Sequence, residues 1–252
     1  MHVLKIFFAR ILCSKPIGIL CSIFFRNKIP YFNSLIYTDS PFIKDSIKAM
    51  LYWNIYESAE ARFVSKHITN KYDVVELGSS IGAIGTLAGK IKGDKKLICV
   101  EVNPDLTDII KKNLILNGVN NYRVCNVGIG NSNSCLWFNE GANNTTSYLS
   151  TGRESGSKKI ETLKLSNILQ KESVGKYQLI CDIEGSEIDI LLNDPQSLEN
   201  CELMIIEAHK VQRNNVTYTA EDIKKMIEKL NFSLIDQYSV NFVFTKNYEI
   251  PN

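Results

Sequence analysis

The fold is decided by the ten residues Glu76-Leu77-Gly78-Ser79-Ser80-Ile81-Gly82-Ala83-Ile84-Gly85. The apolar run at 73–77 comes first and predicts a buried strand. Apolar residues then recur at helical spacing, at Ile81, Ile84, Leu87 and Ile91. A strand, a glycine-containing turn and a helix in this order predict a β-α unit with a ligand site at the turn.

The three glycines of this stretch have separate predicted roles. Gly78 lets the chain turn sharply beside a ligand, and Gly82 leaves out a side chain where the helix start approaches that ligand. Gly85 is expected to allow close packing of the helix on the strand.

The spacing of the turn indicates which ligand it binds. The dinucleotide fingerprint is Gly-x-Gly-x-x-Gly, whose second glycine lets a pyrophosphate lie against backbone amides. Here Ser80 stands at that position. The pattern acid-x-Gly-x-x-x-Gly is typical of methyltransferases, in which the methionine end of S-adenosylmethionine lies over the turn. The turn therefore predicts S-adenosylmethionine as cofactor, bound by Glu76, Gly78, Ser79, Ser80 and Gly82.

The next two strands extend the predicted cofactor site. The strand at 96–100 ends at Glu101, where a carboxylate can accept both ribose hydroxyls, and Val102 follows it. The strand at 122–127 ends with Asn126 and Val127, which would flank the adenine. A strand-end asparagine is equally compatible with a turn role.

Short apolar runs alternate with helical patterns from residue 72 onward, which predicts parallel β-α-β units. Further strands are expected at 177–182 and 202–207, and the last two, at 232–238 and 241–245, as antiparallel neighbours. The prediction is an α/β fold: a Rossmann-like, seven-stranded, mostly parallel sheet with helices on both faces, at 72–252. A helical extension is expected at 1–71. An Asn-, Ser- and Gly-rich excursion at 131–160, with a strand near 135–138, would shape the acceptor pocket.

The N-terminal segment is basic and apolar. No acidic residue precedes Asp39, and the apolar stretch at 7–25 is interrupted by Arg10, Lys15 and Pro16. A spanning helix needs about 20 mostly apolar residues, so a span is not favoured. Residues 1–28 either lie on an anionic membrane surface as an amphipathic segment, or form a helical layer packed on the domain or on a second subunit.

Composition excludes some classes of protein. The net charge is only +2, so no concentrated basic face for nucleic acid is expected. The seven cysteines include no Cys-x-x-Cys pair, which favours reduced thiols and a cytoplasmic protein. The three histidines lack ligand spacing, and no metal is predicted.

Later motifs carry a family resemblance. They are Asp182-Ile183-Glu184-Gly185-Ser186-Glu187, Ile205-Ile206-Glu207-Ala208-His209, and Asn113-Leu114 followed by Asn117-Gly118. With the glycine turn and Tyr56-Glu57, they make the chain resemble the FkbM family of methyltransferases over residues 56–209. That family commonly has Asp-x-Gly-Ala-Asn-x-Gly at the turn, whereas Glu76 and Ser79-Ser80 stand here. The resemblance implies a class I methyltransferase fold and O-methylation, often of sugars in glycans, lipopolysaccharides or secondary metabolites.

A sugar hydroxyl is a poor acid, so methyl transfer to it benefits from a positioned base. Asp182 and Glu184 follow one strand and His209 follows its neighbour, at the carboxyl edge of the predicted sheet. These three are the predicted catalytic residues, and His209 has the most suitable unperturbed pKa. Asp182 is also expected to contact the cofactor. Glu57 either closes over the cofactor or pairs with a cation.

Three alternatives stay open at this point. Asp182 and Glu184 could hold a divalent metal that orients the acceptor. An NAD-dependent oxidoreductase could use a similar sheet, although Ser80 and the lack of a Tyr-x-x-x-Lys pair count against it. A non-catalytic cofactor-binding module is the third.

Overall fold

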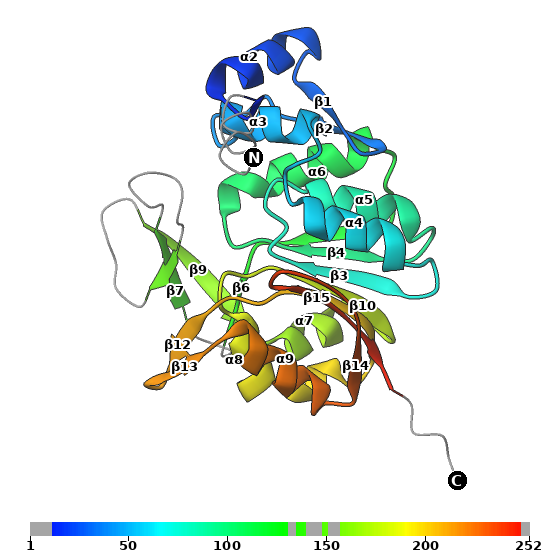
Figure 1. Ribbon diagram of the computed structural model, residues 1–252, viewed down its shortest axis with the longest axis vertical. Helices are drawn as coiled ribbons and strands as arrows, with labels where there is room; N and C mark the ends of the chain where they lie inside the picture. The colour runs from blue at the N-terminus through cyan, green and yellow to red at the C-terminus, as the bar shows by residue number, and fades with distance from the viewer. Residues whose placement is uncertain (1–11, 131–134, 140–147, 151–156, 248–252) are drawn as a thin grey trace, which may run out of the picture.

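The computed structural model describes residues 12–130, 135–139, 148–150 and 157–247. Its centre is a seven-stranded sheet with five adjacent parallel strands (Figure 1). β15 is antiparallel to both of its neighbours, as predicted for the last two strands. The strand order is β14 (Phe232–Tyr238), β15 (Asn241–Lys246), β11 (Cys201–Glu207), β10 (Tyr177–Cys181), β3 (Asp73–Leu77), β4 (Leu97–Val100) and β5 (Tyr122–Cys125).

Helices cover both faces of the sheet, as predicted (Figure 1). Alternate residues of each strand point to opposite faces, so Val74 packs with one layer and Val75 with the other. The first layer contains α4 (Ser58–His67), α5 (Ala83–Ile91) and α6 (Thr107–Leu116). The second contains α7 (Leu165–Lys171), α8 (Glu187–Asn193) and α9 (Ala220–Glu228).

Two predicted helix starts are confirmed. Asn103 accepts a hydrogen bond from the Asp105 backbone N–H at 3.0 Å, ahead of the short helix η1 (Pro104–Leu106) that leads into α6. Thr219 and Asp222 form a reciprocal capping box at the start of α9. These contacts satisfy backbone donors that the first helical turn leaves free.

The N-terminal extension is not purely helical. Between α2 (Lys15–Phe24) and α3 (Asp45–Tyr52) lies an antiparallel hairpin of β1 (Lys28–Tyr31) and β2 (Ser34–Tyr37). Ile29, Tyr31 and Ile36 of this hairpin are fully buried and belong to the same core cluster as α5 and α6. The extension therefore shares its core with the sheet.

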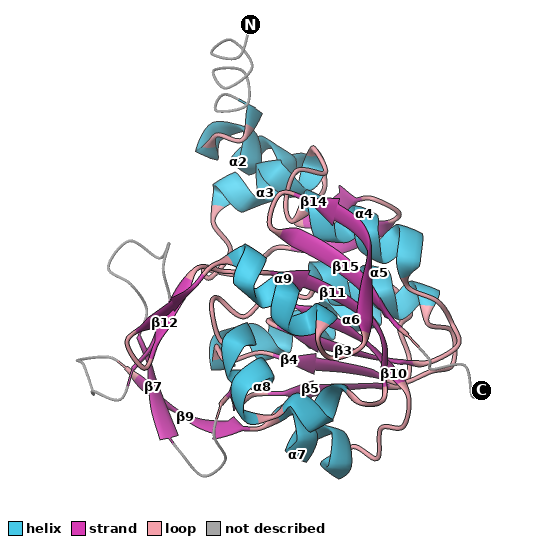
Figure 2. Cartoon of the chain, turned by 60° about the horizontal axis from the view of Figure 1, so that its bottom comes forward, coloured by secondary structure: helices cyan, strands magenta, loops and turns pink. Residues whose placement is uncertain are grey.

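Small strands flank the carboxyl edge of the main sheet (Figure 2). The predicted strand near 135–138 is β7, which pairs antiparallel with β8 and β9. Within the predicted excursion at 131–160, residues 131–134, 140–147 and 151–156 lie outside the described residues. The strands are β6 (Gly128–Ile129), β7 (Cys135–Asn139), β8 (Tyr148–Ser150), β9 (Lys158–Leu163), and the unpredicted hairpin β12 (Val211–Arg213) and β13 (Val216–Tyr218).

None of the helices in the described part of the chain has the length and apolar character that crossing a bilayer requires.

Candidate functional site

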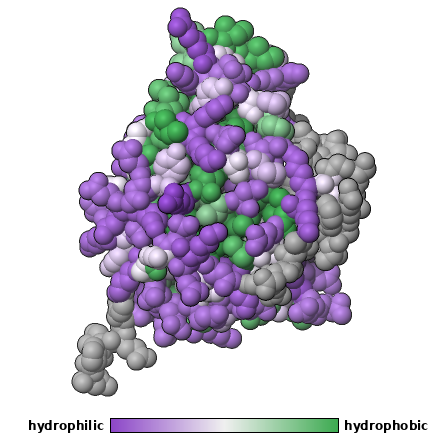
Figure 3. Space-filling model, turned by 180° about the vertical axis from the view of Figure 1, so that it is seen from behind, coloured by the Kyte–Doolittle hydropathy of each residue, from purple (hydrophilic) through white to green (hydrophobic). Residues whose placement is uncertain are grey.

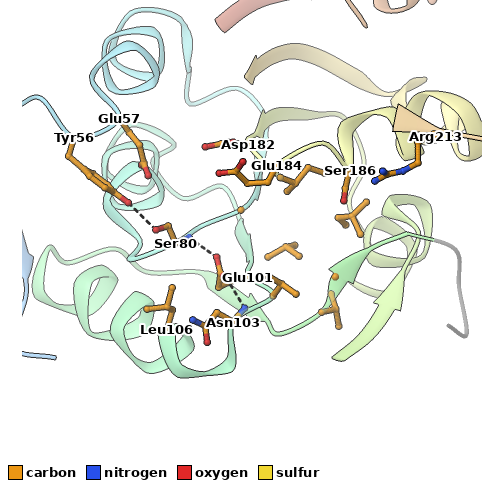
Figure 4. A pocket seen from close by; sticks show the side chains of 17 residues that line it. Tyr56, Glu57, Ser80, Glu101, Asn103, Leu106, Asp182, Glu184, Ser186 and Arg213 are labelled. Carbon is orange, nitrogen blue, oxygen red and sulfur yellow. Dashed lines mark hydrogen bonds between the residues drawn. The ribbon is translucent and has the colours of Figure 1, made fainter. Parts of the chain in front are cut away.

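A cavity of about 580 Å³ lies at the carboxyl ends of β3, β4 and β10 (Figure 4). Parallel α/β sheets bind ligands at this edge. Of the predicted cofactor residues, seven line the cavity: Glu57, Gly78, Ser80, Glu101, Val102, Val127 and Asp182. The predicted catalytic residue Glu184 lines it as well.

The glycine turn is packed more closely than the sequence suggests. Gly78 has a φ of +86°, and a Cβ there would lie 1.7 Å from the Asp182 carbonyl oxygen. Gly78 therefore lets the turn lie directly against the end of β10, beside the cavity.

The other two glycines make room inside the protein. A Cβ on Gly82 would lie 3.0 Å from Ile110 Cα, so this residue permits close approach of α6 and does not line the cavity, contrary to the predicted approach to a ligand. A Cβ on Gly85 would lie 2.4 Å from Glu76 Oε2. Gly85 thus admits the Glu76 carboxylate, which is buried behind the turn together with Ser79. Neither Glu76 nor Ser79 lines the cavity.

Glu101 joins the glycine turn to the end of β4. Its Oε2 accepts the Ser80 backbone N–H at 2.7 Å, and its Oε1 accepts the Asn103 N–H at 2.7 Å (Figure 4). Burial raises the pKa of Glu101 to about 7. Asn126 does not line the cavity; its side-chain amide donates to the backbone carbonyls of Glu101 and Val102. Asn126 therefore holds this strand end in place.

Carboxylates gather at the other end of the cavity. Glu57 and Asp182 line it, and Glu60 on α4 is only 3% exposed. Burial and the neighbouring acidic charges raise the pKa of Glu57 and Glu60, and burial followed by the charge of Glu207 raises the pKa of Asp182 to about 7. A cationic ligand would relieve this crowding of negative charge.

His209 is oriented by a buried glutamate. Its Nδ1 lies 3.1 Å from Oε1 of Glu187, which is 1% exposed and also accepts the Ile183 backbone N–H. Its Nε2 lies 3.5 Å from Glu184 Oε2 and 3.7 Å from Asp182 Oδ1. The structure therefore brings the three predicted catalytic residues together.

The surroundings of His209 change its expected protonation. The hydrogen bond to Glu187, and the charges of Glu187, Asp182 and Glu184, raise the pKa of His209 to about 9. The imidazole is then protonated at neutral pH. The unperturbed pKa, which favoured His209 as the base, does not apply here.

Tyr56 and Arg213 are among the cavity residues to which the sequence assigned no role in the site. The Tyr56 hydroxyl lies 2.9 Å from Ser80 Oγ, so Tyr56 fixes the turn from the N-terminal side. Arg213 lines the cavity from β12, and its guanidinium pairs with Asp189 at 3.2 Å. The sequence signal for Tyr56 was its position next to the motif residue Glu57. No sequence motif marked Arg213 or the β12–β13 hairpin that carries it.

Among the residues that the structure describes, two groups of side chains are close enough to hold a metal ion. Ligand atoms lie within 4.8 Å of one another in the group Asp182, Glu187 and His209, and in the group Glu60, Asp182 and Glu207. Glu184, the expected metal partner of Asp182, belongs to neither group.

The fold and the turn define a Rossmann-like methyltransferase, and a comparison with known families agrees. The family model described as methyltransferase FkbM domain matches residues 77–234, more than half of the chain. The chain therefore belongs to the FkbM methyltransferase family. It is an S-adenosylmethionine-dependent methyltransferase, as the sequence predicted, which sets aside the oxidoreductase and the non-catalytic module.

Solved structures of methyltransferases are similar to this chain at low sequence identity. A putative RNA methyltransferase from Pyrococcus horikoshii is 14% identical with a TM-score of 0.46, over 79% of this chain and 85% of that one. A putative tRNA methyltransferase from Streptococcus pneumoniae, solved with S-adenosyl-L-methionine, is 12% identical with a TM-score of 0.46, over 77% and 75%. A putative O-methyltransferase from Klebsiella pneumoniae is 11% identical with a TM-score of 0.44, over 75% and 81%. No curated protein sequence matches the chain at a significant level.

Proposed function

We propose that this methyltransferase methylates a hydroxyl oxygen of a sugar, in a glycan, a polysaccharide or a glycolipid. The observation that carries the proposal is a cluster in which Asp182 and Glu184 line the cavity. His209 does not line the cavity, but its Nε2 lies within 3.7 Å of an oxygen of each of these carboxylates. A hydroxyl must lose its proton on methylation, and this cluster offers groups to receive it. The sugar is proposed because the motifs resemble a family that often methylates sugars.

The cavity fits S-adenosylmethionine at both of its ends. Each Glu101 oxygen accepts one backbone N–H and keeps a further lone pair for a ribose hydroxyl. The acidic end, with Glu57 and Asp182, suits the positive charges of the methionine end. When bound, the cofactor supplies a sulfonium methyl that the acceptor oxygen attacks in line, while the carbon–sulfur electron pair stays on sulfur.

Asp182 is the best placed proton acceptor at neutral pH. Its pKa of about 7 lies near the working pH, where a general base is most effective, whereas His209 already carries a proton. The imidazolium lowers the pKa of Asp182, which opposes the stronger effect of burial. We therefore assign to Asp182 the role of accepting the proton. The His209 imidazolium stabilises the negative charge of Asp182, and Glu187 positions the imidazole.

The test is methyl transfer to a panel of free and lipid-linked sugars, followed by mass spectrometry of the product. We expect Asp182→Asn to lower kcat by about 10²- to 10⁴-fold. The comparison is made at saturating S-adenosylmethionine, because the loss of this negative charge also weakens binding of the cofactor. Glu199→Gln, an exposed acid far from this strand edge, is the control. Full turnover in Asp182→Asn would show that Asp182 is not the base. A product methylated on nitrogen would contradict the proposed O-methylation.

A metal-assisted reaction is the second candidate, because two groups of three side chains around Asp182 have metal-like spacing. Their oxygen-rich composition would suit Mg²⁺ or Mn²⁺. Activity that disappears with a chelator and returns with Mg²⁺ would favour this version, and activity indifferent to the chelator would exclude it.

We propose that the reaction takes place in the cytoplasm. Cys13 and Cys125 are free thiols, and so are the buried Cys21, Cys99, Cys181 and Cys201. Such thiols are typical of a reducing compartment.

A further inference from the structure

Helix α2 presents an apolar face that the described residues leave uncovered. Gly18 and Cys21 face inward and are buried. On the opposite side the exposed fractions are 40% for Ile19, 61% for Leu20, 71% for Ile23 and 81% for Phe24. α2 lies at one end of the molecule in Figure 1, and Figure 3 shows apolar surface gathered at that end.

Positive charge surrounds this face. Lys15 begins α2, and Arg26 and Lys28 follow it; all three are exposed. No acidic residue precedes Asp39. We name these seven residues the α2 surface: Lys15, Ile19, Leu20, Ile23, Phe24, Arg26 and Lys28.

Aromatic rings continue the apolar surface onto α3. The Phe25 ring lies 5.3 Å from that of Tyr52, which lies 4.8 Å from that of Trp53. Tyr52 is 37% and Trp53 is 41% exposed. Partly exposed tyrosine and tryptophan are typical of surfaces at the level of lipid head groups.

The packing of α2 prevents its apolar face from turning inward. A Cβ on Gly18 would lie 1.7 Å from the Asp45 carbonyl oxygen, so α2 and α3 are in direct backbone contact. The Asp45 carboxylate is paired with Lys48 at 3.0 Å, which reduces its negative charge beside α2. The α2 surface is thus held outward with its positive charge intact.

We propose that the α2 surface binds an anionic membrane, with α2 lying in the plane of the head groups. Its ten residues are too few to span a bilayer, whereas an apolar face bordered by lysine and arginine is what an interfacial helix requires. Basic residues near an anionic leaflet each strengthen binding by about fivefold. The excess of basic residues, with no acid among them, favours lipid over a second copy of this chain, whose own α2 surface would carry the same charge.

The test is co-sedimentation of the full chain with vesicles containing about one third phosphatidylserine, and with pure phosphatidylcholine vesicles, at low salt. Neither cofactor nor acceptor is added, so the outcome is independent of the proposed reaction. The apolar variant is Leu20→Glu, Ile23→Glu and Phe24→Glu together. The charge variant is Lys15→Glu, Arg26→Glu and Lys28→Glu. The control is Ile115→Glu, because Ile115 is 66% exposed on α6.

We expect the unmodified protein and the control to bind phosphatidylserine vesicles at least about tenfold more tightly than neutral ones, and both variants to lose at least about tenfold of that binding. Removing residues 1–28 is a poorer test, because it would also delete Cys21 from the core. Equal sedimentation with both vesicles, or unchanged binding by the two variants, would overturn the proposal. So would a dimer that the apolar variant converts to a monomer, because the α2 surface would then be a subunit interface.

Discussion

Three residues that line the cavity have strained backbones. Glu57, Ser80 and Glu184 have φ angles of 42°, 48° and 52°, although none is glycine. A left-handed residue with a side chain costs about 1–2 kcal/mol. Such strain persists where the surroundings hold the residue in place, and it tends to occur at functional sites. Here it directs three polar side chains toward one cavity.

At the same scale, we predict that Gly78→Ala severely destabilises the protein. The new Cβ would meet the Asp182 carbonyl and would also carry the strain of a positive φ. We expect the free energy of unfolding to fall by at least about 3 kcal/mol in urea titrations. Gly118→Ala is the matched control: its φ is +68° but nothing lies within 4 Å, so it should cost only about 1 kcal/mol. Similar losses in both variants would show that the contact with Asp182 does not matter.

At the scale of elements, two asparagines attach the N-terminal hairpin to the sheet domain: Asn113 of α6 and Asn117, which caps the C-terminal end of that helix. Asn113 is fully buried; it accepts the Tyr37 backbone N–H at 2.6 Å and donates to the Ile81 carbonyl at 2.8 Å. Asn117 bonds to both backbone groups of Leu35. This part of the family motif therefore joins β2 to α6 and, through Ile81, to the glycine turn.

We predict that Asn113→Ala lowers the free energy of unfolding by about 2–4 kcal/mol, because it leaves the buried Ile81 carbonyl and the partly buried Tyr37 N–H without their partners. Asn117→Ala removes three side-chain bonds, to both backbone groups of Leu35 and to the Asn113 carbonyl. Its position is half-buried, so water can replace these bonds, and the change should cost about 1 kcal/mol. Thermal or urea unfolding of the pair measures the difference. Equal effects would mean that burial of Asn113 does not set the strength of this attachment.

The elements that the sequence predicted are those with strong local patterns. The strand ends around Leu77, the cap at Asn103 and the capping box at Thr219 were each visible in a few consecutive residues. The β1–β2 hairpin was missed because its short strands are buried through contacts with α3, α5 and α6, which no local pattern reveals. The pKa of His209 was misjudged for the same reason: it depends on Glu187, 22 residues away in the chain.

At the scale of the whole molecule, the buried carboxyls predict an unusual dependence of stability on pH. Burial raises the pKa of Glu76 and of Glu101 from 4.5 to about 7. Both carboxyls bind protons more readily in the folded state, so their ionisation between pH 4.5 and 7 destabilises it. The raised pKa of His209 acts in the same direction. The stabilisation of the folded state by protonated His209 is lost as the pH rises from 6.5 through about 9.

We therefore expect the Tm of the ligand-free protein to fall by about 5 °C or more between pH 5.5 and pH 8 in calorimetric scans. Glu101→Gln should make the fall smaller, because it removes one of the titrating groups. A Tm that rises over this interval would contradict the assigned direction of these pKa shifts.

The cofactor assignment is best tested by calorimetric titration of the purified protein with S-adenosylmethionine and, in parallel, with NAD. We predict that S-adenosylmethionine binds and NAD does not. We also predict that Glu101→Ala weakens cofactor binding by at least about 100-fold, because two ribose contacts and the anchor of the Ser80 turn are lost together. Binding of NAD alone, or cofactor affinity unchanged in Glu101→Ala, would contradict this assignment.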